Sequence, residues 1–351
     1  MMLPAPRRRR RRRSAGGFVA GFVVGLVVLG GLGWLAAGPL LSDGGASGDR
    51  GAVGGTPQAG TQTVERLPAA RPPVSEPQDA VGPLPEPAGA AHVDLTQPSL
   101  LSYLRLRPGP KAGLAFDLAD GRVLWRHRAT AVRPIASLTK LMTALLAVER
   151  FGPSERVRIA REVDSVGGSR MGGLKTGRRV RADVLLKGLL ISSANNAAVA
   201  LAIAGAGSQR AWVALMNTRA ELLGLTCTHF ADAHGLDRRN RSCVADLATL
   251  AMRAMNEPRV AEIARKRYAR VWPGSGRKFT LRTTNHLLRD HYPGVIGLKT
   301  GFTNPAGFCL VAIVERGEQR IGIVLLGSKD SFGDARRLAR EAARTGVLPA
   351  A

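Results

Sequence analysis

Hydrophobic and polar positions divide this 351-residue chain into four parts. Residues 1–14 are dominated by arginine, and residues 15–41 are apolar and carry no charge. Residues 42–95 are rich in glycine, proline and alanine and have no periodic apolar pattern. Residues 96–346 contain apolar runs of strand and helix length between turn signals, so the pattern predicts a folded domain in this part.

The second part, residues 15–41, predicts a membrane-spanning helix, because about 20 apolar residues suffice to cross a bilayer core. Arg7–Arg13 come directly before it, and positive charge in this position stays on the cytoplasmic side. We therefore expect a basic cytoplasmic N-terminus, one transmembrane signal-anchor, and everything after it outside the cytoplasm. A cleaved signal peptide has a shorter apolar region, and Leu35-Ala36-Ala37 is a poor cleavage site. Cleavage there would make the protein secreted.

Residues 42–95 predict a flexible linker. A segment of this composition cannot bury enough apolar surface to offset the entropy lost on ordering. The random-coil relation gives its 54 residues a typical reach of about 40 Å. The linker would therefore hold the folded domain away from the membrane.

Strand patterns lie near both ends of the folded part. Ala112–Asp117 and Arg122–Trp125 flank a tight turn and predict a hairpin, and Phe308–Val314 and Ile321–Leu326 predict a second one. Helices are predicted over Leu138–Val148, Leu185–Leu190, Ala197–Ala204, Ala211–Leu223, Ala245–Met255 and Asp334–Arg344. Strands at both ends with helices between them predict an α+β fold, in which an antiparallel sheet lies beside a mostly helical block.

The charge balance is strongly basic. Lysine and arginine total 51 against 26 acidic residues, a net charge of +25. An excess of this size raises nucleic acid as a partner. Arg7–Arg13 are explained by the adjacent apolar segment, however, and the remaining charge is spread along the chain, so no nucleic-acid partner is expected. The remaining charge has two interpretations: a solvated arginine-rich surface, or attraction to anionic wall polymers or lipid head groups.

Cysteines and histidines do not predict a metal or cofactor site. The chain has three cysteines and neither C-x-x-C nor H-E-x-x-H. Cys309 lies in an apolar run and is interpreted as a core residue. Cys227 and Cys243 flank a turn-rich stretch and can pair if the domain is exported, which the sequence leaves open. His229 and His234 are interpreted as structural, and the other four histidines lack metal-ligand spacing.

Ser137 and Lys140 form an S-x-x-K motif that opens an apolar run. A serine hydroxyl is a weak nucleophile until a neighbouring base takes its proton. If the helix starts at Ser137, Lys140 lies one turn away on the same face. A lysine buried against an apolar face and near another cation has a lowered pKa and can act as that base. The motif alone is common by chance, and a serine at this position is also an ordinary helix cap.

Two further triplets follow in the chain. Ser193 and Asn195 form S-x-N, in which the hydroxyl can relay a proton and the amide can hold both a lysine and a substrate. K-T-G occurs twice: Lys175-Thr176-Gly177 lies in a charged stretch before Ser193, and Lys299-Thr300-Gly301 comes last and leads into a strand. A cation, a hydroxyl and a small glycine on an edge strand suit a substrate that ends in a carboxylate. We assign the second K-T-G, with Thr303, to that carboxylate and interpret Lys175 as structural.

With the three triplets in this order, the chain from about Leu114 to Leu338 resembles the serine-type D-alanyl-D-alanine carboxypeptidases, the low-molecular-mass penicillin-binding proteins. The neighbouring segments Pro134–Thr143, Thr228–Phe230, His234–Asp237 and Gly297–Thr303 carry the resemblance as well. It implies a five-stranded antiparallel sheet flanked by helices, with a helical lobe that holds S-x-N. It also implies penicillin-sensitive removal of the terminal D-alanine from peptidoglycan stem peptides through an acyl-enzyme.

The resemblance also implies roles for individual residues. The catalytic set is Ser137 as nucleophile, Lys140 as general base and Ser193 as proton relay. The substrate-binding set is Asn195, Lys299, Thr300, Gly301, Phe302 and Thr303, and the backbone N–H groups of Ser137 and Phe302 would form the oxyanion hole. The chain departs from the family pattern at Ala194, where glycine is frequent, and at Phe302, where histidine is frequent. We expect the N-terminal helix to replace the C-terminal membrane helix of many relatives.

Other functions share parts of this pattern. A class A β-lactamase needs a glutamate for deacylation, and no Glu-x-x-Leu-Asn lies between Asn195 and Lys299. A D,D-endopeptidase that cuts peptidoglycan crosslinks shares every motif, and a non-catalytic receptor for penicillin or wall fragments would keep the same residues. The expected partners are the peptidoglycan stem peptide, β-lactams as covalent inhibitors, and the membrane through the N-terminal helix. No cofactor is expected.

Overall fold

The computed structural model describes residues 92–274 and 276–350. The predicted cytoplasmic N-terminus, the signal-anchor and all but the last few linker residues lie outside the described residues. Within the described ranges no single helix is both long and apolar enough to cross a membrane. Helices α3 (Asn195–Ala206) and α4 (Gln209–Leu222) reach that length and hydropathy only together, and they are bent by 86° relative to each other.

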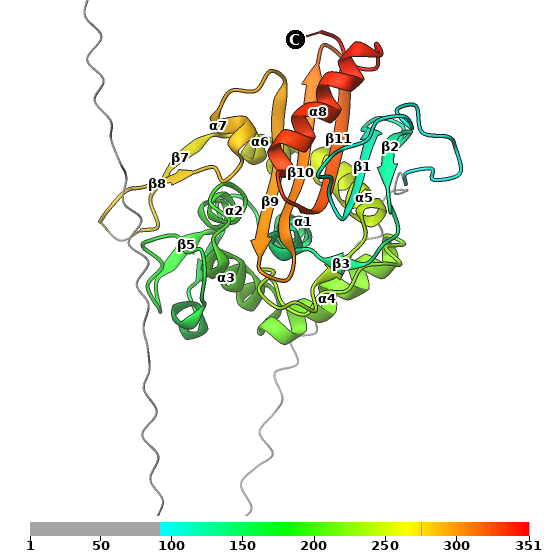
Figure 1. Cartoon of the computed structure of the whole chain (residues 1–351). Coiled ribbons are helices and arrows are strands. Elements are labelled where there is room, and N and C mark those ends of the chain that lie inside the picture. Colours follow the sequence, from blue (N-terminus) through cyan, green and yellow to red (C-terminus); the bar gives the residue numbers. More distant parts are fainter. Residues whose placement is uncertain (1–91, 275, 351) are drawn as a thin grey trace, which may run out of the picture. The chain divides into compact units, whose positions relative to one another are not determined.

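A five-stranded sheet forms the centre of the domain (Figure 1). Its strands are β1 (Ala112–Asp117), β2 (Val123–His127), β9 (Val295–Thr303), β10 (Gly307–Arg316) and β11 (Gln319–Ser328). They lie in the order β2-β1-β11-β10-β9, and each neighbouring pair is antiparallel. The sheet thus joins the two predicted hairpins through the pairing of β1 with β11, which confirms the α+β fold and leaves β2 and β9 as its edges.

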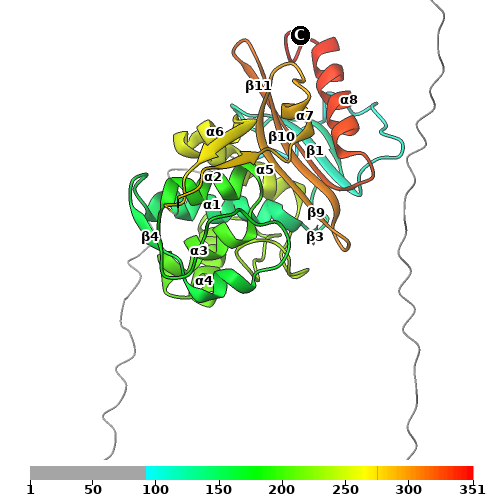
Figure 2. The ribbon, with the colours of Figure 1, turned by 90° about the vertical axis from the view of Figure 1, so that its left-hand side faces the viewer.

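Both faces of the sheet are covered. Alternate side chains of a strand point to opposite faces, so Val311 and Ile313 of β10 belong to one core while Leu310 and Ala312 belong to another. Helix α5 (Val244–Asn256) packs on the first face, and α8 (Ser331–Arg344) covers the second (Figures 1 and 2). Each fully buried side chain of this kind stabilises the fold by about 1.5–3 kcal/mol.

A helical lobe lies beside the sheet and begins with α1 (Lys140–Arg150). It contains α2 (Ala182–Ile191), α3 and α4, which pack on one another in sequence. Helix α3 is rich in alanine, and its first eight residues are all buried, so small side chains allow close helix packing there. The remaining elements are β3 (Arg133–Pro134), β4 (Arg156–Arg158), β5 (Arg179–Arg181), β6 (Arg241–Ser242), α6 (Pro258–Ala264), β7 (Tyr268–Val271), β8 (Phe279–Arg282), α7 (His286–Arg289) and short 3₁₀ turns at Ala136–Thr139 and Arg161–Ser165.

The six predicted helices are present, with starts that differ from the prediction by one to three residues, and two of these differences have a local cause. Ser137 does not begin an α-helix: residues 136–139 form a 3₁₀ turn and α1 starts at Lys140. Helix α8 starts three residues before the predicted Asp334, because the Asp330 side chain accepts a hydrogen bond from the backbone N–H of Gly333 at 2.9 Å and caps the helix.

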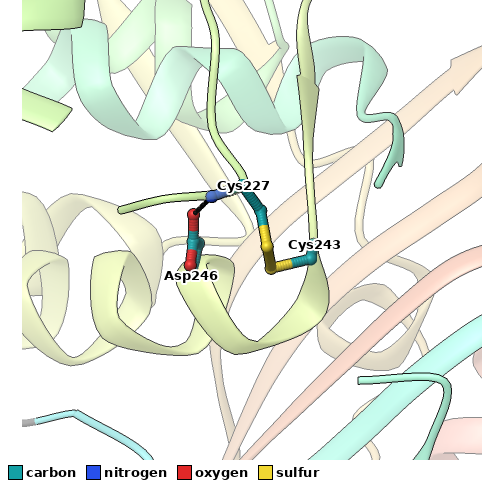
Figure 3. Close-up of side chains that lie close together, drawn as sticks. All are labelled: Cys227, Cys243 and Asp246. Carbon is teal, nitrogen blue, oxygen red and sulfur yellow. Dashed lines mark hydrogen bonds between the residues drawn. A yellow bond between two sulfur atoms is a disulfide. The ribbon is translucent and has the colours of Figure 1, made fainter. Parts of the chain in front are cut away.

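The pairing of Cys227 with Cys243, which the sequence left open, is present as a disulfide (Figure 3). Asp246 lies beside it on α5 and accepts hydrogen bonds from the Cys227 backbone N–H at 2.8 Å and from the Thr228 hydroxyl at 2.7 Å. The disulfide therefore joins the start of α5 to the segment that leads into the loop around His234. The two sulfurs are bonded to each other, so neither Cys227 nor Cys243 offers a thiolate ligand to a metal beside Asp246.

Candidate active site

Ser137 lies on the 3₁₀ turn between β3 and α1, and two glycines approach this turn closely. A Cβ added to Gly301 of β9 would lie 3.0 Å from the Ser137 backbone nitrogen, and one added to Gly235 would lie 2.0 Å from the Ala136 carbonyl oxygen. Gly235 also has a φ of +90°, in the region that favours glycine. The absence of side chains at both positions thus lets β9 and the Gly235 loop lie directly against the serine.

Lys140 lies at the first position of α1, and its amine points at the serine. The Nζ atom donates hydrogen bonds to the Ser137 hydroxyl at 2.9 Å and to Asn195 Oδ1 at 2.7 Å. It also donates to the backbone carbonyl of His234. The side chain is fully buried, although Ser137 remains partly exposed. The base candidate is therefore withdrawn from water while the nucleophile candidate stays accessible to a substrate.

Lys299 forms the second half of the site. Its Nζ donates hydrogen bonds to the Ser193 hydroxyl at 2.9 Å and to the Thr300 carbonyl at 2.8 Å. Ser193 connects α2 to α3 and has a φ of +57°, a conformation that non-glycine residues seldom adopt and that concentrates at functional sites. The loop thus holds the Ser193 hydroxyl towards β9 at a conformational cost.

Burial changes the electrostatics of both lysines. Burial lowers the pKa of Lys140 well below its ordinary value, nearby Lys299 lowers it further, and the Asp232 carboxylate opposes the shift. Burial alone lowers the pKa of Lys299 to about 7. A neutral amine has a free electron pair, so Lys140 can accept the proton of the Ser137 hydroxyl to which it is bonded.

Asn195 anchors Lys140 from the helical lobe. Its Oδ1 accepts the bond from Lys140, and its Nδ2 donates to the Gly167 carbonyl at 2.8 Å. The amide group is thus bonded through both its oxygen and its nitrogen, which fixes its orientation beside Lys140. The two polar residues of the S-x-N triplet thus contact different lysines: Ser193 accepts a hydrogen bond from Lys299, and Asn195 accepts one from Lys140.

The loop after Phe230 contains a residue that the sequence analysis did not identify, Asp232. Its carboxylate accepts hydrogen bonds from the backbone N–H groups of His234 at 2.8 Å and Asp237 at 2.7 Å, and also from Gly235. These bonds hold the loop so that the His234 carbonyl reaches Lys140. An aspartate two or three residues before a glycine is a signal of such a turn.

The substrate-side residues lie at the open end of the edge strand β9. The Thr300 hydroxyl is hydrogen bonded to the Thr284 hydroxyl at 2.6 Å, and the Thr303 hydroxyl accepts from the Ala306 N–H at 3.3 Å. The Phe302 side chain is exposed and packs against Phe308, with ring centroids 4.7 Å apart. An edge strand offers free backbone groups to an extended peptide, so this end of β9 can receive one.

The second Lys-Thr-Gly triplet does not join this cluster. Lys175 is exposed, and the Thr176 hydroxyl donates to the Asp164 carboxylate at 2.6 Å within the same loop region. In the described part of the chain, no hydrogen bond joins this triplet to Ser137, Lys140 or Ser193.

The geometry defines a class of site: a partly exposed serine hydroxyl that is hydrogen bonded to a buried lysine, with a second serine–lysine pair beside it. The family model described as D-alanyl-D-alanine carboxypeptidase, peptidase family S11, matches residues 109–330. This is well over half of the chain and includes every residue of the cluster. The chain belongs to this family of serine peptidases.

Three known proteins illustrate the similarity. The D-alanyl-D-alanine carboxypeptidase DacD of Escherichia coli is 37% identical over 240 residues, which cover 64% of this chain and 60% of the relative. The D-alanyl-D-alanine endopeptidase of Pseudomonas aeruginosa is 33% identical over 275 residues, which cover 72% of this chain and 88% of the relative. The crystal structure of penicillin-binding protein D2 from Listeria monocytogenes in the ampicillin-bound form is 31% identical, with a TM-score of 0.59, and covers 70% of this chain and 98% of that one. The chain thus spans about six-tenths of the length of some curated carboxypeptidase relatives.

Proposed function

We propose that this protein is a membrane-anchored serine D,D-carboxypeptidase that removes the terminal D-alanine of peptidoglycan stem peptides. The observation that carries the proposal is the 2.9 Å hydrogen bond from the buried Lys140 amine to the partly exposed Ser137 hydroxyl. Hydrolysis of a peptide through a serine ester needs such a pair. Family membership supplies the substrate class.

The reaction begins when Lys140 Nζ takes the proton of the Ser137 hydroxyl and the Oγ attacks the carbonyl carbon of the penultimate D-alanine. The backbone N–H groups of Ser137 and Phe302 stabilise the oxyanion of the tetrahedral intermediate. The leaving nitrogen of the terminal D-alanine then takes a proton from the Ser193 hydroxyl, and the proton that Lys140 took from Ser137 passes to Ser193 in its place, so Lys140 is neutral again and Lys299 keeps its proton. The C–N bond breaks, free D-alanine departs, and an ester on Ser137 remains.

Deacylation reverses the roles. A water molecule gives a proton to the neutral Lys140 amine as its oxygen attacks the ester carbonyl, and the shortened peptide leaves with a new carboxylate. Lys140 returns the proton to Ser137 Oγ as the C–O bond breaks, so the enzyme ends in its starting state. β-Lactams would acylate the same Ser137, and the ampicillin-bound form of penicillin-binding protein D2 from Listeria monocytogenes supports this expectation.

Lys299 binds the terminal carboxylate of the substrate in this proposal. In the free protein its pKa is lowered to about 7 by burial, so a part of the population carries a neutral amine near neutral pH. An incoming carboxylate favours the charged ammonium form. Substrate binding and protonation of Lys299 are therefore coupled, with Thr300 and Thr303 beside it at the end of β9.

We also propose that residues 15–41 anchor the protein in the cell membrane, with the catalytic domain on the outer side. Arg7–Arg13 would keep the N-terminus in the cytoplasm. The Cys227–Cys243 disulfide supports this location, because disulfides persist in oxidising compartments. The segment of residues 42–95 would then give the domain a reach of about 40 Å into the wall space.

A D,D-endopeptidase is the second candidate, since the match to the relative of that name covers 88% of that relative. The test incubates the purified protein with diacyl-L-Lys-D-Ala-D-Ala and, separately, with a crosslinked peptide dimer, with and without penicillin. Penicillin-sensitive release of D-alanine supports the carboxypeptidase. Cleavage of the dimer alone supports the endopeptidase, and covalent penicillin binding without either product would identify a receptor.

A further inference from the structure

A second concave site lies at the edge of the sheet opposite to β9. Residues 98–110, the segment that leads into β1, form a cavity of about 850 Å³ together with strand β2. This volume is within the range of small-molecule sites in proteins, roughly 300–1,000 Å³. Figure 1 shows the segment in cyan beside β2, on the side of the sheet away from β9.

The cavity has a cationic lining. Arg105, Arg107, Arg126 and His127 contribute to its wall, and none of its lining residues is acidic. The other lining groups are the hydroxyls of Ser99 and Ser102 and the apolar surfaces of Pro98, Leu104, Leu106, Pro110 and Trp125. The composition matches a ligand that has an anionic group joined to a less polar body.

Among residues 92–274 and 276–350, no carboxylate forms an ion pair with these three arginines. Arg105 and Arg126 donate hydrogen bonds to the backbone carbonyls of Ser102 and Leu95, which orient the guanidinium groups without cancelling their charge. Arg107 is exposed, and within the described ranges it has neither a hydrogen bond nor an ion pair. Three like charges around one cavity repel one another, so an anion bound there gains their combined attraction.

The segment that forms much of the cavity wall is hydrogen bonded to the sheet. The indole N–H of Trp125 donates to the Leu104 carbonyl at 3.1 Å, and the Leu101 backbone N–H donates to the Leu124 carbonyl at 2.7 Å. These bonds join the segment to β2 at two places. The Ser99 Oγ atom is buried and has no hydrogen-bond partner in the described structure. A preformed pocket costs little to order on binding.

We infer that this cavity binds a phosphate group carried by a component of the cell envelope. Arginine is suited to phosphate because its planar fork donates parallel hydrogen bonds to two oxygens. Three arginines exceed what one carboxylate would need, and the cavity is large enough for the glycerol or sugar to which a phosphate is attached. Four strand spacings separate β2 from β9, roughly 19 Å, so a bound ligand leaves the Ser137 site open.

The test measures phosphate binding by calorimetry with the purified full chain. The probes are inorganic phosphate, a short glycerol-phosphate oligomer, and a water-soluble short-chain phosphatidylglycerol. The cavity variant is R105Q/R107Q/R126Q. The control, R178Q/R179Q/R181Q, removes the same charge from exposed arginines at β5 on the helical lobe.

The expected result is that at least one probe binds, that its affinity falls about tenfold or more in the cavity variant, and that the control stays within about twofold. Preference for the oligomer identifies a polymer as the phosphate source, and preference for the phosphatidylglycerol identifies a lipid head group. D-Alanine release from a soluble peptide should be the same in both variants. Failure of every probe to bind, or equal losses in the two variants, overturns the inference.

Discussion

Replacement of Lys299 by methionine is expected to make the protein more stable while it abolishes peptide hydrolysis. The wild-type side chain is almost completely buried, and its pKa falls from an ordinary 10.5 to about 7. Methionine has a similar length and no charge, so it fills the same space without the cost of burying an ammonium group.

The size of the expected stabilisation follows from the lowered pKa of Lys299. A fall from 10.5 to about 7 corresponds to an unfavourable contribution to folding of about 5 kcal/mol, which is present at about pH 7 and below. The variant loses the hydrogen bonds to Ser193 and to the Thr300 carbonyl, which contribute about 1 kcal/mol each. A net gain of about 2–3 kcal/mol remains near pH 7. For a domain of this size, this gain in stability raises Tm by roughly 4–12 °C.

The pH dependence of the stability difference between wild type and Lys299→Met tests this explanation more directly. The folded-state pKa of Lys299 lies below its unfolded value, so the unfolded chain binds more protons and wild-type stability rises between about pH 7 and pH 10.5. The advantage of Lys299→Met should therefore shrink across this range. Urea unfolding at pH 7 and pH 10 measures it, with the exposed Lys175→Met as control. A variant that is less stable than wild type at pH 7, with an unchanged difference at pH 10, would refute the reasoning.

Four further changes have defined outcomes. Ser137→Ala should abolish covalent labelling by penicillin in mass spectrometry with Tm unchanged within about 2 °C, and persistent labelling would exclude Ser137 as the acylated residue. Gly301→Ala should lower kcat by about 10–100-fold, because its Cβ would lie 3.0 Å from the Ser137 nitrogen and displace β9 from the serine; an unchanged kcat would mean that β9 tolerates the shift. Asp232→Asn should move the acid limb of the acylation pH profile to lower pH, because the carboxylate raises the pKa of Lys140; a shift to higher pH would contradict this. Cys243→Ser should lower the free energy of unfolding by about 2–4 kcal/mol in urea denaturation, and a loss below about 0.5 kcal/mol would show that the disulfide does not constrain the unfolded chain.

The α+β fold was largely predictable from the sequence, because the central strands of its sheet are long apolar runs. Residues 309–314 and 321–326 are all buried, and such strands are recognisable in the sequence as continuous apolar runs. The order of the strands was less accessible, because the pairing of β1 with β11 depends on contacts between the two ends of the domain. Local composition carries no information about which distant strand is the partner.

The site was predictable as a set of residues and not as a geometry. The triplets identify Ser137, Lys140 and Lys299, and the structure brings these residues together. The 3₁₀ turn at Ser137 and the positive φ of Ser193 depend on packing by β9 and on the surrounding loops, so propensities in the sequence do not reveal them. Asp232 acts through backbone N–H groups of its own loop, and a single aspartate near a glycine is too common to indicate this.

The pairing of β1 with β11 has a consequence for the order of events during biosynthesis. Ala112 pairs with Leu326, some 200 residues later in the chain, and the Lys299 strand lies next to the same C-terminal hairpin. Contacts between such distant segments form late in folding. A chain that emerges from its N-terminus therefore carries Ser137 for most of its synthesis without the strand that completes the site. Under the proposed mechanism, Ser137 would acquire its full reactivity only after nearly all of the polypeptide has been synthesised, because Lys299 and Gly301 lie on that late strand.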